Sequence, residues 1–337
     1  MIERFGKSFD NKAVLRTSSW IKTQSKEARK KALQFSKEER KELRACPMCE
    51  STELSEFVVV YDFLYCQCQN CENLFLKNPL KDTAKLYTND GKKSSYEMYL
   101  SDEIFERRLK LIAQPKVQFI SDVAKKYTQD KQWLDIGSGG GENLFAAKKL
   151  GFRVSGFESD SKAVAFANRK LGRDVVREGF LDSTNCDKAL LHSIKNANVI
   201  SFFNVLEHLD NPKETLSFLG KTMRKKSLLA IEVPRHPSLA SYANFLAPNR
   251  VYRHLIPPFH LNIFSEKALE LASRGGGLSC VAKWTYGQGF MDMIHAFKEY
   301  EKNGAMYEKI SLLSNSIQAL IDENGLADFL LIVLQKK

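Results

Sequence analysis

The pattern of hydrophobic and polar positions becomes regular from residue 132 onward. Short apolar runs there alternate with stretches of helical periodicity, and two of these helical stretches end at a glycine, Gly151 and Gly172. Strands that alternate with helices in this way predict a parallel α/β sheet. The expected strands are Gln132–Ile136, Phe152–Glu158, Asp174–Arg177, Asn198–Phe203 and Leu228–Val233, and the expected helices include Asn143–Leu150 and Ser161–Leu171.

A different pattern precedes this region, over residues 45–80. Two Cys-x-x-Cys pairs, Cys46 with Cys49 and Cys68 with Cys71, flank a stretch with strand-like runs, and 18 residues separate them. This spacing is a strong zinc signature. Four thiolates leave no coordination position for water, so we expect a structural zinc ion in a small ribbon. Two disulfides are the alternative, and Cys66 is a substitute ligand.

The flanking segments divide the rest of the chain. Residues 1–44 carry 13 Lys and Arg against 6 Asp and Glu, which accounts for most of the formal charge of +11. We interpret them as a basic helical arm, with a capping box at Ser36, whose charges are solvated or bind phosphate. Residues 81–115 are expected to be a helical linker that caps a pocket, and 116–337 the main domain. Within it we expect a lid over 235–264 and a helical insertion over 291–326.

Composition places few further limits on the chain. A length of 337 residues suits one large domain with a small one, and 43% hydrophobic and 27% charged residues are ordinary for a globular protein. No apolar run approaches the roughly 18 residues of a membrane span. The first residues show charges but no apolar export signal, so we expect a cytoplasmic protein.

A glycine loop follows the first strand of the regular region. It reads Asp135-Ile-Gly137-Ser-Gly139-Gly-Gly141, and Glu142 stands where a dinucleotide fingerprint has its last glycine or alanine. That favours S-adenosylmethionine over NAD. A buried Asp135 needs a partner, and the amino group of S-adenosylmethionine is a suitable one. A glycine-rich turn without ligand is the alternative.

Polar residues at the ends of later strands extend this candidate site. Glu158 lies 19 residues beyond Gly139, where an acidic side chain can accept both hydroxyls of a ribose. Phe180 and Leu181 are candidates to flank an adenine or to pack in the core. The fourth strand runs into the segment 204–212, and ligands of open α/β sheets bind beyond such strand ends. We therefore expect its Asn204, Glu207 and His208 beside the cofactor.

The order Leu-Asp-Ile-Gly-Ser-Gly-Gly-Gly, Gly-Phe-Glu, Asn-Val-Leu-Glu-His-Leu resembles the class I S-adenosylmethionine-dependent methyltransferases, over about residues 115–337. The resemblance implies a Rossmann-like, seven-stranded, mostly parallel sheet. It also implies that the 135–139 loop holds the methionine part of the cofactor, that Glu158 holds the ribose and that Asn204 lies on the cofactor's near side. The loop residues concerned are Asp135, Gly137, Ser138 and Gly139.

Two further segments narrow the resemblance. The four cysteines and the following Asn73–Pro79 are similar to the zinc-binding leader of a subgroup that includes bacterial methyltransferases acting on nucleotide-linked sugars. The segment His260–Ser265 is similar to a histidine-containing segment that often covers the active site in such enzymes. In the insertion, Ile310, Leu313, Ile317, Leu320 and Ile321 follow helical spacing, which indicates packing or a dimer face.

Methyl transfer from a sulfonium requires an aligned acceptor and, for most acceptors, a base. Four of the six histidines lie between the fourth strand and Ser265. We rank His208 and His260 first as catalytic residues, with Glu207 as a partner. A hydrogen-bonded structural histidine is the alternative for each of them. Tyr96 and Tyr99 are expected to line the pocket.

Cations and aromatic residues in the lid suit an anionic, ring-bearing acceptor, although they are equally typical of an ordinary surface. They are Arg235, Tyr242, Arg250, Tyr252 and Arg253. We therefore predict a methyltransferase that O- or C-methylates a small molecule, in particular a sugar or nucleotide-linked sugar. The first alternative is an rRNA or tRNA methyltransferase that uses the ribbon and the basic arm to bind RNA, and the second is a non-catalytic binding protein.

Overall fold

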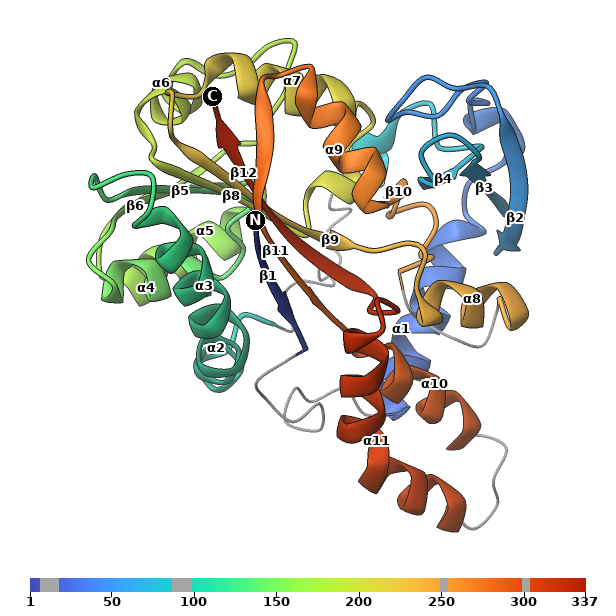
Figure 1. Ribbon diagram of the computed structural model, residues 1–337. Coiled ribbons are helices and arrows are strands. Elements are labelled where there is room, and N and C mark those ends of the chain that lie inside the picture. Colours follow the sequence, from blue (N-terminus) through green and yellow to red (C-terminus); the bar gives the residue numbers. More distant parts are fainter. Residues whose placement is uncertain (7–17, 87–98, 249–253, 299–303) are drawn as a thin grey trace.

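An eight-stranded sheet forms the centre of the molecule, in the order β1-β11-β12-β9-β8-β5-β6-β7 (Figure 1). The computed structural model describes residues 1–6, 18–86, 99–248, 254–298 and 304–337. The strands are β1 (Ile2–Phe5), β5 (Gln132–Ile136), β6 (Arg153–Glu158), β7 (Val176–Glu178), β8 (Val199–Phe203), β9 (Leu228–Pro234), β11 (Leu278–Tyr286) and β12 (Phe329–Lys336).

The parallel strands β7, β6, β5, β8 and β9 pair in register, and β12 runs antiparallel between β9 and β11. Every residue of β8 and β9 is buried, as a continuous apolar strand covered on both faces requires. The predicted α/β fold with a mostly parallel sheet is therefore confirmed. No helix in the described part of the chain is long and apolar enough to cross a membrane.

Helices cover both faces of this sheet (Figure 1). One face packs on a core around Trp133, Leu144 and Phe166, and the opposite face packs on a core around Leu216 and Leu269. The first set is α2 (Asp102–Arg108), α3 (Gln114–Ala124), α4 (Glu142–Lys149) and α5 (Ser161–Leu171), with a π-helical stretch Leu109–Ala113 between α2 and α3. The second set is α6 (Lys188–Asn196), α7 (Pro212–Thr222) and α9 (Glu266–Arg274).

The N-terminal segment differs from the predicted helical arm. Its first residues form β1, an edge strand that pairs in parallel with β11, and the Trp284 indole donates a hydrogen bond to the Gly6 carbonyl oxygen at 2.7 Å. The helix α1 (Ser18–Ala32) is the part of the arm that is α-helical among the described residues. The capping box at Ser36 is confirmed, although the helix that it begins is only a 3-10 turn, Lys37–Glu39.

A second, smaller sheet has the order β10-β4-β3-β2. Its strands β2 (Leu54–Val60), β3 (Phe63–Cys68) and β4 (Leu74–Leu76) come from the cysteine-containing segment. The fourth strand, β10 (Asn262–Ile263), comes from the predicted lid and pairs antiparallel with β4. The ribbon is therefore continuous with the main domain through a shared sheet.

Two helices occupy the predicted insertion, α10 (Gly289–Lys298) and α11 (Ala305–Glu323). The buried face of α11 is polar, and Leu313 and Leu320 are 57% and 60% exposed. Ile310, Ile317 and Ile321 are half-buried, so the five apolar positions are covered only in part, and both packing and a dimer face stay predictions. A shorter helix, α8 (Leu239–Leu246), follows β9 in the lid.

Candidate active site

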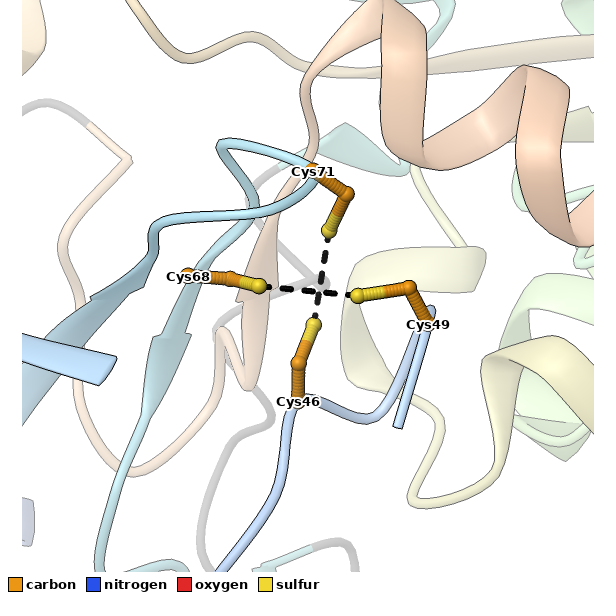
Figure 2. Close-up of side chains that lie close together, drawn as sticks. All are labelled: Cys46, Cys49, Cys68 and Cys71. Atoms are coloured by element: carbon orange, nitrogen blue, oxygen red, sulfur yellow. Dashed lines mark hydrogen bonds between the residues drawn. The ribbon is translucent and has the colours of Figure 1, made fainter. Parts of the chain in front are cut away.

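The four cysteines of the ribbon converge on one point (Figure 2). The Sγ atoms of Cys46 and Cys71 are 3.5 Å apart, as are those of Cys49 and Cys68, and all four lie within 4.8 Å of one another. Thiolates around a tetrahedral zinc ion at about 2.3 Å have similar separations. The four side chains therefore fit a closed metal site. Cys66 is buried but does not belong to this group.

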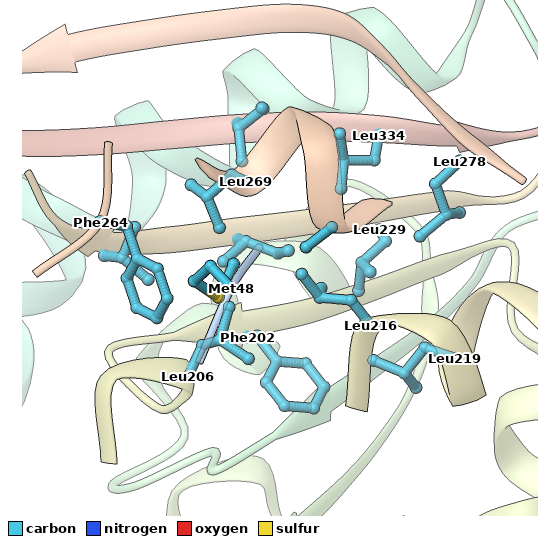
Figure 3. Close-up of a cluster of buried hydrophobic side chains, with 14 of the residues drawn as sticks. Met48, Phe202, Leu206, Leu216, Leu219, Leu229, Phe264, Leu269, Leu278 and Leu334 are labelled. Carbon is cyan, nitrogen blue, oxygen red and sulfur yellow. The ribbon is translucent and has the colours of Figure 1, made fainter. Parts of the chain in front are cut away.

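The first cysteine pair is anchored in the core of the main domain. Met48, between Cys46 and Cys49, is 1% exposed and belongs to the same apolar cluster as Phe202, Leu206 and Leu269. Figure 3 shows the thioether among these side chains. The knuckle thus packs directly on the helices and strands that carry the rest of the candidate site.

Hydrogen bonds join the ribbon to the segment that contains His260. The Tyr65 hydroxyl donates to the His260 carbonyl oxygen at 2.9 Å, and the Leu76 amide donates to the Leu261 carbonyl oxygen at 2.9 Å. The Ser265 hydroxyl donates to the carbonyl oxygen of Cys71, one of the four converging cysteines. The backbone position of His260 therefore depends on the ribbon.

The glycine loop connects β5 to α4 as predicted. Gly137, Gly139 and Gly141 have φ of 74°, 53° and 85°, a backbone region that disfavours other residues. A Cβ at Gly137 would lie 2.4 Å from Val205 Cγ2. The loop therefore lies directly against the segment that follows β8, and Ser138 within it is buried with no hydrogen-bond partner for its Oγ among the described residues.

Asp135 is the second-last residue of β5 and has no exposed surface. Its Oδ1 accepts a hydrogen bond from the Ser201 hydroxyl at 2.5 Å, whereas Oδ2 has no hydrogen-bond partner in the part of the chain that the structure describes. Burial raises the pKa of Asp135 to about 7. An orphaned buried carboxylate oxygen beside a glycine loop fits a ligand that brings a cationic donor.

Glu158 lies at the end of β6, directly beside the loop. Its Oε2 accepts a hydrogen bond from the Gly139 amide at 2.9 Å, and its Oε1 accepts one from the Asp160 amide at 3.0 Å. The carboxylate is thereby fixed at the sheet edge that the strand ends share. Of the two apolar candidates after β7, Phe180 is 71% exposed and Leu181 is buried, so only Phe180 offers a free ring face.

The predicted catalytic residues also come together. Glu207 is fully buried, and among the described residues neither of its carboxylate oxygens accepts a hydrogen bond. Its Oε1 lies 4.0 Å from His208 Nε2, and the rings of His208 and His260 are 4.9 Å apart. Burial raises the pKa of Glu207 well above its usual value and lowers the pKa of His208. Asn204, in the same segment, is exposed and has a φ of 57°.

The other two histidines of this region, His236 and His254, are buried and make polar contacts with side chains outside the group of Glu207, His208 and His260. His254 is buried with its Nε2 at 2.8 Å from Asp328 Oδ2. His236 is buried between Ser241, whose Oγ is 2.9 Å from its Nδ1, and the ring of Phe57. Burial lowers the pKa of His236 to about 4.

Arg235 does not contribute to a cationic pocket mouth, contrary to the prediction. Its guanidinium donates to the carbonyl oxygens of Gly325 and Ala327 at 2.8 and 3.0 Å and pairs with Glu266, so it holds the turn between α11 and β12 against α9. Tyr242 lies on α8 and is 45% exposed, and the Tyr99 ring contacts the Arg108 guanidinium. The other residues proposed for the pocket lie outside the described residues: Tyr96, Arg250, Tyr252 and Arg253.

Sequence reasoning missed a buried ionic group behind the site. Lys116 of α3 is hydrogen-bonded to Glu232 of β9, and the Tyr286 hydroxyl donates to the same carboxylate. The Lys116 ammonium also lies 3.9 Å from the Phe203 ring centroid, and its charge opposes the rise of the Asp135 pKa. The available signal was Glu232 itself, a carboxylate within an otherwise apolar strand.

Comparison with known families places this chain in one of them. A family model described as a methyltransferase domain matches residues 105–283, more than half of the chain. No match was found among curated proteins. A SAM-dependent methyltransferase from Archaeoglobus fulgidus is 20% identical with a TM-score of 0.45, and the alignment covers 72% of this chain and 100% of that one. Geranyl diphosphate C-methyltransferase from Streptomyces coelicolor A3(2) is 16% identical with a TM-score of 0.44, over 74% and 86% of the two chains. By the family match, this chain belongs to the methyltransferase-domain family.

Proposed function

We propose that the protein is an S-adenosylmethionine-dependent methyltransferase that acts on a small molecule. The observation that carries the proposal is the orphaned Oδ2 of the buried Asp135 next to the glycine loop. A cationic amino group would satisfy this oxygen, and the membership in the methyltransferase-domain family supports the same cofactor. S-adenosylmethionine supplies such an amino group together with a methyl group on a sulfonium.

The roles of the surrounding residues follow from their positions. Asp135 would accept a hydrogen bond from the amino group, and Gly137 and Gly139 would allow close approach to the backbone. Glu158 keeps lone pairs for ribose hydroxyls, because each of its oxygens can accept more than one hydrogen bond. The exposed ring of Phe180 is available to an adenine, whereas Leu181 is packed in the core.

In this proposal, Glu207, His208 and His260 form the group that activates the acceptor. The segment from Asn204 to His208 follows β8 and contacts the glycine loop through Val205. An acceptor bound there would lie near both the methyl donor and these three side chains. Removal of a proton from the acceptor hydroxyl or carbon is the task that remains for the protein.

We also propose a structural zinc ion at Cys46, Cys49, Cys68 and Cys71. The convergence of the four thiols supports it, and four thiolates leave no coordination position for substrate. The ion would hold the small sheet to which β10 belongs, and with it the backbone of His260. The zinc therefore supports the site without taking part in the reaction.

The acceptor that we propose is a sugar or nucleotide-linked sugar, on the resemblance of the cysteine-containing leader. To test this, zinc-loaded protein is incubated with methyl-labelled S-adenosylmethionine and fractionated cell extract. We expect the label to enter the small-metabolite fraction. Label in RNA, with an affinity that falls steeply with salt, would favour the RNA methyltransferase instead. Failure to bind S-adenosylmethionine at all would contradict both proposals.

A further inference from the structure

The group Glu207, His208 and His260 presents three electron-pair donors to one point. One ligand atom from each residue lies within 4.8 Å of the other two. His208 Nδ1 is 2.9 Å from the Phe259 carbonyl oxygen, and His260 Nδ1 is 2.7 Å from the His254 carbonyl oxygen. A carbonyl oxygen only accepts hydrogen bonds, so each Nδ1 carries a proton, and in the neutral form of each ring the lone pair is on Nε2.

Two properties of this group point to a cation. The carboxylate of Glu207 is fully buried, and neither of its oxygens has a hydrogen-bond partner among the described residues. The 4.0 Å between Glu207 Oε1 and His208 Nε2 is too long for a hydrogen bond within the group. Metal-binding histidines commonly donate their second ring nitrogen to a backbone carbonyl, as both do here.

On this geometry we propose that Glu207, His208 and His260 bind a divalent transition-metal ion that activates the acceptor. Two imidazoles and one carboxylate suit ions such as Mn²⁺, Fe²⁺ or Zn²⁺ and leave coordination positions open. The ligand atoms would close by about 1 Å around an ion at about 2.1 Å. The site is distinct from the four-cysteine site, whose thiolates leave no open position.

The ion gives the active site a preferred acceptor, a hydroxyl oxygen. This inference rests on the proposed methyl transfer. The acceptor oxygen binds the ion and releases its proton to water, because a divalent cation lowers the pKa of a bound hydroxyl. A lone pair of that oxygen then forms the bond to the methyl carbon as the carbon–sulfur bond breaks. The bonding pair remains on sulfur, and the products are a methyl ether and the neutral thioether S-adenosylhomocysteine.

The test uses full-length, zinc-loaded protein and Mn²⁺ alone, because thiolates compete poorly for Mn²⁺. Electron paramagnetic resonance measures free Mn²⁺ during the titration. We expect one bound ion per chain in the wild type and a dissociation constant raised at least about tenfold in Glu207→Gln and in His260→Gln. His192→Gln, a histidine substitution on α6, is the matched control and should bind like the wild type.

Calorimetry with S-adenosylmethionine on the same samples separates the two proposals. The metal site is supported if the wild type binds both the cofactor and Mn²⁺, and if both variants bind the cofactor but not Mn²⁺. The metal site is refuted if the wild type binds the cofactor but binds no Mn²⁺ up to about 1 mM. It is also refuted if the variants bind Mn²⁺ as tightly as the wild type. Either result leaves the proposed methyl transfer intact. Methyl transfer that is insensitive to EDTA and to added Mn²⁺ overturns it as well. No cofactor binding would instead refute the proposed function.

Discussion

Asp135 couples the stability of the fold to pH. The carboxyl is fully buried, and burial raises its pKa from 3.8 to about 7. Between these values the folded chain holds a proton that the unfolded chain has released, so the free energy of unfolding falls as the pH rises. At about 1.4 kcal/mol per pH unit, the loss across the whole interval is about 4 kcal/mol. Above about pH 7 the contribution is constant.

Asp135→Asn isolates this effect, because it removes the titration while the side chain keeps its shape and an oxygen for the Ser201 hydroxyl. Urea unfolding of both zinc-loaded proteins is measured from pH 5.5 to 8, where the other titrating groups are common to both. The wild-type value minus the variant value should fall by about 2 kcal/mol between pH 5.5 and 7 and then level off. A difference that does not change with pH would refute the assigned pKa.

Cofactor binding should show the opposite dependence on pH. A cationic amino group requires the ionised carboxylate, so the wild-type affinity for S-adenosylmethionine should rise about tenfold per pH unit up to about 7 and then stay constant. Asp135→Asn should bind weakly and without this slope. Calorimetric titrations of both proteins give the comparison, and parallel curves would show that Asp135 does not contact the charged group.

Three further perturbations test the packing around the site. Met48→Ala should lower the free energy of unfolding in urea by about 2–5 kcal/mol, because it removes a fully buried thioether. An unchanged free energy would mean that the segment Cys46–Cys49 does not anchor the ribbon. Gly137→Ala should abolish cofactor binding in calorimetry, since its Cβ would clash at 2.4 Å, while Gly172→Ala has a similar φ of 71° with no atom within 4 Å and should bind normally. Lys116→Met should lower the free energy of unfolding by about 3–5 kcal/mol, because it leaves Glu232 without its cationic partner. The double variant Lys116→Met, Glu232→Gln should lose less. Equal losses in the two proteins would contradict a coupled pair.

The sequence was sufficient for the parts of the fold that follow local rules. Strands β8 and β9 are almost continuous apolar runs, β5 leads into a glycine loop with its own spacing, and β6 follows the glycine that ends α4, so their positions could be predicted to within a few residues. The edge strand Ile2–Phe5 could not be predicted, because its four residues form a strand only by pairing with β11, which lies far along the chain. The two-residue strand Asn262–Ile263 likewise exists only through its pairing with β4.

The site shows the same division. Residues at strand ends, such as Asp135 and Glu158, were predicted because parallel strands bring their carboxyl ends to one edge. Lys116 was not, because a single lysine in an amphipathic helix usually reaches solvent, and only the buried Glu232 explains its inward position. Arg235 was assigned to the pocket mouth for its charge, but its guanidinium is hydrogen-bonded to carbonyl oxygens of the turn that follows α11.

Binding of S-adenosylmethionine to the zinc-loaded chain at pH 8 is the decisive measurement for a cofactor site at the glycine loop. Isothermal titration calorimetry should give one site per chain with a dissociation constant on the order of micromolar, and Glu158→Ala should weaken it by removing the acceptor for the ribose hydroxyls. Folded, zinc-loaded protein that releases no heat with S-adenosylmethionine up to about 1 mM would contradict a cofactor site at the glycine loop.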